Sequence, residues 1–303
     1  MVRLPISSLF LCSISGAFIR GPLNLALPSR PFVTGRDVRV ASRRGGEMSA
    51  EGMARSKVVH LVRHGQAQHN PRAEKARNAG CDTPTFLELM RQDDAFDAAL
   101  TPTGLEQAAG ASQHSIRGVE LIVASSLSRA IDTADIIFPP GEQTATRVSR
   151  DEFREISGWL LNAKRRTRSE LSGRNPSWDF SGLHSEEDGL WTPDLEGEAA
   201  CAERAYLGLR WLWDRPEHHA AVVAHGGVWA FLLGAPGHPN VRAAPSMAAR
   251  FRNCELRSCR LSLLSPGDGG EGRPVFAIDP VDAAEEDGAI LNGVALDANA
   301  ATV

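Results

Sequence analysis

Three short segments of the sequence combine arginine or histidine with glycine or serine, in patterns that suit chemistry on a phosphate group. They are Arg63-His64-Gly65, the run from Ser125 to Arg129, and His225-Gly226-Gly227. A guanidinium group can bind two phosphate oxygens at once, and a neutral imidazole has a lone pair that can attack phosphorus. Fixed positive charges nearby favour that neutral form. We therefore interpret the first histidine as a nucleophile and the other basic side chains as phosphate ligands.

Each of these segments follows a short apolar run of strand length. The runs cover 58–62, 121–124 and 220–224, and helical patterns lie between them over 103–113, 128–137 and 198–213. Ser128 is expected to cap the second of these helices. Such alternation predicts a mostly parallel sheet with helices on both faces. Ligands of such sheets bind at the carboxyl ends of the strands, so the three segments should meet at one edge.

The motifs resemble those of the histidine phosphatase superfamily, also called phosphoglycerate-mutase-like proteins, and in particular its plant and fungal branch. The similarity extends over about residues 57–264 and implies a three-layer α/β/α sandwich. Residues 97–108 look like the D-x-x-L-T-x-x-G-x-x-Q-A segment of the family, and residues 125–134 resemble its S-x-L-x-R-A-x-x-T-A helix start. The resemblance implies a catalytic core of Arg63, His64, Arg129 and His225, with Asn70 touching phosphate.

The leaving oxygen of a phosphate ester needs a proton, which a carboxylic acid can supply. Glu152 and Glu155 are both candidates, and the resemblance selects Glu155 and leaves Glu152 as a solvated surface carboxylate. The predicted reaction has two steps: His64 takes the phosphoryl group, and water then hydrolyses the phosphohistidine. No metal and no cofactor is expected, because the arginines supply the positive charge. We expect a small phosphorylated substrate, and a phosphoprotein remains open.

Two other functions fit the same motifs. A phosphoglycerate mutase also forms a phosphohistidine, but its acid glutamate is followed by an Arg-His-Tyr-Gly stretch, where this chain has residues 156–159, Ile-Ser-Gly-Trp. The basic run over 164–168 could bind a second acidic group, although a solvated charged face is the simpler interpretation. The other function is a pseudophosphatase that binds phosphorylated ligands without turnover. A metalloenzyme is disfavoured, because His60 and His64 lie about 13 Å apart on an extended strand.

Composition narrows the classes of partner. The chain has 303 residues and a net charge of −4, so nucleic acid is not expected as a partner. Its five cysteines are scattered and form no C-x-x-C pair, which favours free thiols over a zinc site or a disulfide framework. No apolar run of about 20 residues is present, so we expect no membrane partner. The oligomeric state is not predicted.

The two ends of the chain differ from the middle. Residues 1–36 contain four arginines and no acidic residue, which is typical of a targeting peptide. The Ala17-Phe18 pair resembles that of bipartite plastid leaders, so we expect a leader over 1–55 and a plastid or other organelle; a start at Met48 or Met53 would instead give a cytoplasmic protein. The folded domain is predicted over 56–265. A Gly-rich and acidic tail, 266–303, should be mostly disordered, with one possible strand over 274–278.

Overall fold

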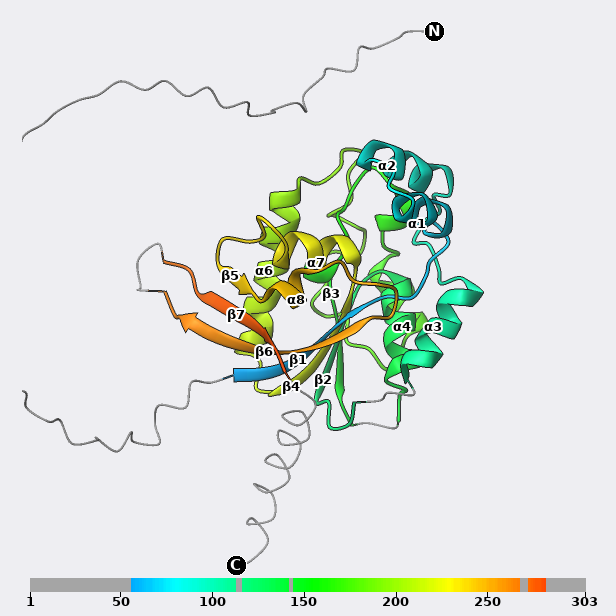
Figure 1. Ribbon diagram of the computed structural model, residues 1–303. Helices are drawn as coiled ribbons and strands as arrows, with labels where there is room; N and C mark the ends of the chain where they lie inside the picture. The colour runs from blue at the N-terminus through cyan, green and yellow to red at the C-terminus, as the bar shows by residue number, and fades with distance from the viewer. Residues whose placement is uncertain (1–55, 113–115, 142–143, 268–271, 282–303) are drawn as a thin grey trace, which may run out of the picture. The chain divides into compact units, whose positions relative to one another are not determined.

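The computed structural model describes residues 56–112, 116–141, 144–267 and 272–281. Within these ranges a seven-stranded sheet has the strand order β3-β2-β4-β1-β6-β7-β5 (Figure 1). The strands in chain order are β1 (Ser56–Arg63), β2 (Leu121–Ser125), β3 (Thr146–Arg150), β4 (His219–Ala224), β5 (Val241–Ala243), β6 (Leu256–Ser265) and β7 (Val275–Pro280). The predicted leader and the acidic end of the tail lie outside the described residues.

The sheet is mostly parallel, as predicted. In it β6 alone runs against the other strands, since it pairs antiparallel with both β1 and β7, whereas all other pairings are parallel. The strands that carry the chemistry-bearing segments, β1, β2 and β4, are neighbours in the centre. β2 and β4 are buried along their whole length, as expected for parallel strands covered on both faces.

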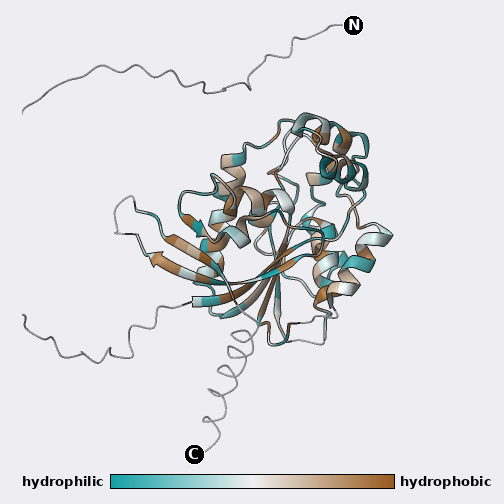
Figure 2. Ribbon diagram, in the orientation of Figure 1, coloured by the Kyte–Doolittle hydropathy of each residue, from teal (hydrophilic) through white to brown (hydrophobic). Residues whose placement is uncertain are grey.

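The helices form a layer on each face of the sheet. In chain order they are α1 (Pro71–Asn78), α2 (Thr83–Gln92), α3 (Pro102–Ser112), α4 (Ser128–Ile137), α5 (Arg168–Arg174), α6 (Glu198–Asp214), α7 (Gly226–Leu233) and α8 (Pro245–Ala248). One apolar core packs α6 and α7 against Val59 and Leu61 of β1, and a second packs α3 and α4 against Val62 of the same strand. Figure 2 shows the apolar strands between the two helical layers. The predicted three-layer sandwich is therefore confirmed.

Two details of the fold differ from the sequence expectations. Ser128 does not cap α4, because it is the first residue of that helix; instead Asp97 accepts hydrogen bonds from the Ser128 amide at 2.9 Å and the Ser128 hydroxyl at 2.5 Å. The sheet also continues beyond residue 265, because β7 pairs with β6. The folded part thus reaches Pro280 and includes the strand expected over 274–278.

None of the helices in the described ranges is both long and apolar enough to cross a lipid bilayer.

Candidate active site

The three predicted segments meet at the carboxyl edge of the central strands. His64 follows β1, His225 follows β4, and their rings lie 4.9 Å apart between centroids. Arg129 comes from the first turn of α4, directly after β2, and its Nε lies 3.4 Å from Nε2 of His64. All three side chains are buried. The parallel order of β2, β4 and β1 thus brings together residues that are up to 161 positions apart in the sequence.

The surroundings of His64 prepare its Nε2 atom for attack. Nδ1 lies 2.6 Å from the carbonyl oxygen of Gly65, and since a carbonyl only accepts, Nδ1 carries the ring proton and Nε2 has the lone pair. Burial lowers the pKa of His64 well below its usual value, and Arg129 and Arg63 lower it further. Gly65 is required because a Cβ there would lie 2.6 Å from the carbonyl oxygen of Gly104.

Two arginines flank this atom, each held by a backbone carbonyl. Arg63 donates to the carbonyl of Phe251 at 3.0 Å and pairs with Glu74, while Arg129 donates to the carbonyl of Asn162 at 2.7 Å. Burial lowers the pKa of Arg129 to about 10, so the side chain stays charged at neutral pH. Nε of Arg63 and Nη2 of Arg129 are buried without a hydrogen-bond partner among the described residues. Buried donors normally have partners, so both suit an anionic ligand.

His225 has a hydrogen bond at one ring nitrogen only. Its Nε2 lies 2.8 Å from the hydroxyl of Ser125, and that hydroxyl also accepts from the amide of Leu127 at 3.3 Å. In the tautomer in which the Ser125 hydroxyl donates to Nε2, the ring proton of His225 lies on Nδ1. Nδ1 is buried with no partner within the described chain, and it provides a third free donor. Burial and Arg129 lower the pKa of His225, which keeps the ring neutral.

Glu155 is held by the first turn of α7, the helix that begins after His225. Its carboxylate accepts from the amides of Gly227 and Val228, both at 3.1 Å, and from Ile156 at 3.0 Å. The positive end of the helix dipole favours a carboxylate at this position. Gly227 is required there, because a Cβ would lie 2.1 Å from Oε1 of Glu155.

Glu152 lies elsewhere, although it precedes Glu155 by only three residues. It pairs with Arg150 and its side chain is 18% exposed, so the solvated surface carboxylate that we expected is instead a partly buried ion pair. The structure thus places one of the two candidate acids at the first turn of α7, the helix that follows His225, and the other in a local salt bridge.

The loop after His64 contributes Asn70 and one residue that the sequence interpretation missed. The Asn70 side-chain oxygen accepts from the Ala67 amide at 2.9 Å. This contact orients the side-chain amide and leaves its NH2 group as the part that can donate to a ligand. His69 is buried, and its Nδ1 has no partner among the described residues. Burial, Arg129 and Arg63 lower the pKa of His69, which places it among the charges of the site. The sequence did contain a signal for His69, because it directly precedes Asn70, the expected phosphate ligand.

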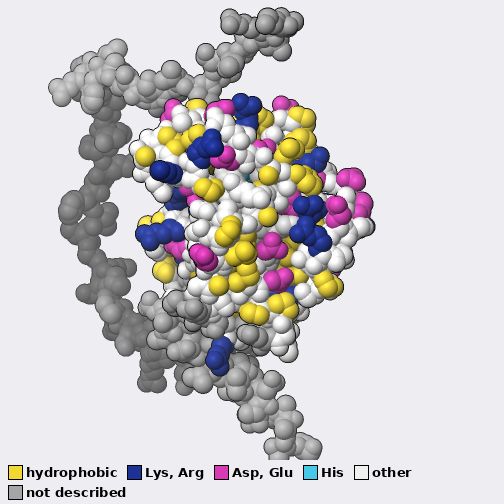
Figure 3. All heavy atoms as spheres, turned by 90° about the vertical axis from the view of Figure 1, so that its right-hand side faces the viewer, with side chains coloured by type: hydrophobic (Ala, Val, Ile, Leu, Met, Phe, Trp, Pro, Cys, Tyr) yellow, Lys and Arg dark blue, Asp and Glu magenta, His cyan; other side chains and the backbone are white. Residues whose placement is uncertain are grey.

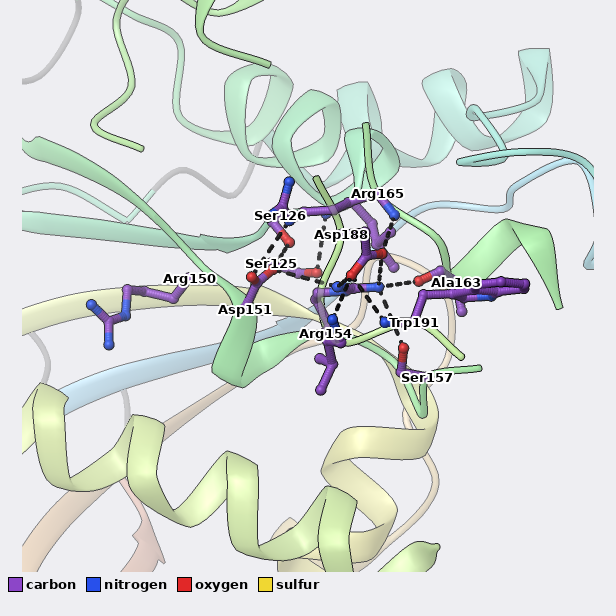
Figure 4. Close-up of polar contacts among 12 residues, drawn as sticks. Ser125, Ser126, Arg150, Asp151, Arg154, Ser157, Ala163, Arg165, Asp188 and Trp191 are labelled. Carbon is purple, nitrogen blue, oxygen red and sulfur yellow. Dashed lines mark hydrogen bonds and ion pairs between the residues drawn. The ribbon is translucent and has the colours of Figure 1, made fainter. Parts of the chain in front are cut away.

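The basic run over 164–168 is only in part a solvated face, because Arg168 is exposed and Arg165 is not. Arg165 is buried and donates to the carbonyls of Ser185, Glu186 and Glu187. Asp188 accepts from the Arg165 amide and from both terminal nitrogens of Arg154, at 2.7 to 2.9 Å, and Figure 4 shows this carboxylate between the two arginines. The network fixes the segment that follows Glu155.

The face of the molecule on which α1 to α4 lie carries no uniform charge. Figure 3 shows basic, acidic and apolar side chains interspersed on the face that is the right-hand side of Figure 1, where α1 to α4 lie. Among the residues that the structure describes, no three His, Cys, Asp or Glu side chains converge in a way that could hold a metal ion.

The family profile of the histidine phosphatase superfamily (branch 1) matches residues 59–270, which is most of the chain. The chain belongs to the histidine phosphatase superfamily. Phosphoglycerate mutase-like protein 1 of Arabidopsis thaliana is 30% identical over 239 residues, 67% of this chain and 80% of the relative. Phosphomutase-like protein 3 of Candida albicans is 29% identical over 192 residues, 60% of each chain.

Solved structures of similar chains include two phosphatases. The alpha-ribazole phosphatase of Shigella flexneri is 18% identical, with a TM-score of 0.41 over 73% of this chain and 95% of its own. A mycobacterial glucosyl-3-phosphoglycerate phosphatase is 22% identical, with a TM-score of 0.42 over 75% of this chain and 99% of its own. The membership itself rests on the profile and on the plant relatives, and it agrees with the resemblance predicted from the motifs.

Proposed function

We propose that this histidine phosphatase superfamily member hydrolyses a phosphate monoester through a phosphohistidine on His64, without a metal ion. The observation that supports this most directly is the set of buried N–H donors around the His64 lone pair. Nε of Arg63, Nη2 of Arg129 and Nδ1 of His225 have no partner among the described residues. Three donors beside a nucleophile suit the three non-bridging oxygens of a transferring phosphoryl group.

In the first step Nε2 of His64 forms a bond to phosphorus while the bond between phosphorus and the ester oxygen breaks. Glu155 must carry a proton before this step, against the preference of the α7 amides for a carboxylate, and it gives that proton to the departing oxygen, so that an alcohol leaves. Arg63, Arg129 and His225 stabilise the charge that spreads over the phosphoryl oxygens. Nδ1 of His64 keeps its proton and donates it in a hydrogen bond to the Gly65 carbonyl. This hydrogen bond stabilises the positive charge of the phosphorylated ring.

In the second step Glu155, now a carboxylate, takes a proton from water as the water oxygen bonds to phosphorus. The bond between phosphorus and Nε2 breaks, inorganic phosphate forms, and the ring returns to its neutral state. The low pKa that burial and the two arginines give His64 favours this return, because a neutral imidazole is the ground state of the site.

A mutase is the alternative activity, and the names of the plant and fungal relatives keep it open. In a mutase the phosphohistidine passes its phosphoryl group to a second hydroxyl instead of water. Incubation with 3-phosphoglycerate and a trace of bisphosphoglycerate separates the two activities. Release of inorganic phosphate supports a phosphatase, and isomerisation without release would identify a mutase. A pseudophosphatase would bind the ester and do neither.

The central test is rapid-quench labelling of the full chain with a phosphorylated substrate, followed by mapping of an acid-labile phosphohistidine. We expect label on His64 and loss of both label and turnover in His64→Ala. The matched control is His184→Ala, because His184 is an exposed histidine outside the site. Wild-type phosphatase activity in His64→Ala would refute the proposed mechanism.

A further inference from the structure

The loop that follows the candidate acid exposes a tryptophan from an unusual backbone conformation. Trp159 comes four residues after Glu155, has a φ of 61° and is 38% exposed. The preceding Gly158 also has a positive φ, 86°, and a Cβ there would lie 1.9 Å from the carbonyl oxygen of Asp194. Bulky residues rarely adopt the left-handed region, and such strain is found mainly at functional sites. The fold therefore holds this indole ring at the surface despite a cost in backbone energy.

Other large apolar side chains, each 40 to 42% exposed, come from segments that backbone hydrogen bonds attach to this loop. They are Phe96, Leu161 and Leu195. The Leu161 carbonyl accepts from the amide of Asp97, the residue after the phenylalanine, at 3.1 Å. The Trp159 amide donates to the Thr192 carbonyl at 2.9 Å, which brings the segment of the second leucine to the loop. We call these three side chains and that of Trp159 the apolar rim.

The apolar rim is continuous with the phosphate site through the backbone. Asn162, the residue after Leu161, holds Arg129 through its carbonyl at 2.7 Å. On the other side, the Cα atoms of Glu155 and Trp159 are at most about 14 Å apart, because four residues span no more than that. Single exposed apolar side chains are ordinary, whereas a cluster of them beside a binding site indicates a surface for a ligand. A leaving alcohol that takes its proton from Glu155 therefore has these side chains within a short distance.

The basic side chains beside the apolar rim are engaged within the chain. Arg166 lies 3.2 Å from a carboxylate oxygen of Asp97, and its guanidinium is 5.2 Å from the centre of the Phe96 ring. The ammonium group of Lys164 lies 4.6 Å from the centre of the Trp191 ring. Both cations therefore have partners in the protein, and the part of this surface that is left for a ligand is mainly apolar.

We propose that the apolar rim binds an apolar ring on the leaving alcohol of the substrate. This inference rests on the proposed function, because it assumes that the phosphoryl group lies between Arg63, Arg129 and His64. The substrate class is then a phosphate monoester whose alcohol carries an aromatic or alicyclic ring a few carbon atoms from the ester oxygen. The rim binds either ring by burial of apolar surface, and its indole and phenyl groups add stacked or edge-to-face contacts to an aromatic one.

The test compares two alkyl phosphates that differ only in the ring. In 3-phenylpropyl phosphate a three-carbon chain separates the ring from the ester oxygen, so the leaving oxygen is similar to that of propyl phosphate. The ratio of their kcat/KM values for phosphate release therefore measures binding of the ring. We expect the full chain to prefer the phenylpropyl ester about tenfold, the effect of burying about 60 Å² of apolar surface. Trp159→Asn should lower the ratio about fivefold, because asparagine tolerates a positive φ and has no ring.

A matched pair of leucine substitutions separates the apolar rim from apolar surface elsewhere. Leu161→Ser should lower the ratio about threefold, the loss of about 25 Å² of contact. Leu264→Ser is the control, because Leu264 is 59% exposed and lies two residues beyond the β6 partner of Ser56, at the opposite edge of the sheet from the site. It should leave the ratio unchanged. The kcat/KM value for propyl phosphate should stay the same in every variant, which shows that the phosphate site is intact.

Equal ratios in Leu161→Ser and Leu264→Ser, or no preference in the unaltered chain, would overturn the inference while phosphohistidine formation still supported the proposed function. A change of oligomeric state in Trp159→Asn with an unchanged ratio would instead assign the apolar rim to a contact between copies of the chain. Inhibition constants of 4-phenylbutylphosphonate and butylphosphonate test the rim without turnover, and the same fivefold loss is expected for Trp159→Asn. Absence of any phosphohistidine would overturn the proposed function, and binding of the two phosphonates would still decide the role of the rim.

Discussion

Substitution of Gly227 by alanine should separate the candidate acid from the rest of the site. A Cβ at this position would lie 2.1 Å from Oε1 and 2.9 Å from Cδ of Glu155, well inside the normal contact distance. The carboxylate is the mobile partner, since Gly227 belongs to the first turn of α7. We expect it to move by about 1 Å and to lose its hydrogen bonds to the amides of Gly227 and Val228, and a displacement of this size costs about 100-fold in rate.

The loss should depend on the leaving group. An alkyl phosphate needs a proton on its departing oxygen, so Gly227→Ala should lower its kcat by about 100-fold, within the range for a lost general acid. The p-nitrophenolate ion is stable without a proton, so p-nitrophenyl phosphate should lose much less in the first step. Rapid-quench measurement of phosphohistidine formation isolates that step from hydrolysis, in which Glu155 acts on water for both esters.

The matched control is Gly173→Ala in α5, where a Cβ would meet nothing within 4 Å. It introduces the same methyl group and should leave both rates unchanged. An equal loss on the two esters in Gly227→Ala, or no loss on either, would show that Glu155 is not the acid of the first step.

Three further predictions follow from the hydrogen bonds and the burial. Ser125→Ala should let the His225 proton move from Nδ1 to Nε2, with a loss of about tenfold in phosphate affinity; imidazole ¹⁵N shifts report the tautomer, and an unaltered Nδ1–H would refute its assignment to Ser125. Asp97→Ala should destabilise the fold by about 1 kcal/mol or more in urea, because α4 loses its cap. Burial and His219 lower the pKa of His60 to about 3, so below pH 6.5 the unfolded chain binds more protons than the folded chain. Acidification from pH 7 to 5 should therefore lower the free energy of unfolding by about 2 kcal/mol, and His60→Leu should not show this loss.

The centre of the site was predictable because its signals are local. The buried runs that became β1, β2 and β4 end directly before Arg63, Ser125 and His225, and the parallel topology then leaves little choice about where the three segments meet. Glu155 was named by resemblance, and its position depends on amides of α7, 72 and 73 residues away. A sequence pattern does not predict a contact between residues so far apart in the chain.

Two of the features that were missed depend on partners distant in the sequence. Ser128 looked like a helix cap, but Asp97 reaches α4 from 31 residues earlier and takes that role. Arg165 looked exposed within a basic run, but the carbonyls of residues 185–187 surround it. The amino-acid composition gives the number of charged residues but does not show which of the charged side chains are buried.

Because Glu155 is held by the amides of α7, the segment that follows it in the chain can vary without moving the acid. The acid and His225 are both positioned by the start of one helix, so the chain that follows Glu155 is not needed to keep the two in register. That chain, from Ile156 to Gly197, leads to α6 and includes the segment fastened by Asp188. We therefore expect grafts within residues 166–187, which leave in place the Asn162 carbonyl that holds Arg129 and the contact between Arg165 and Asp188, to alter which ester is accepted while the phosphohistidine still forms.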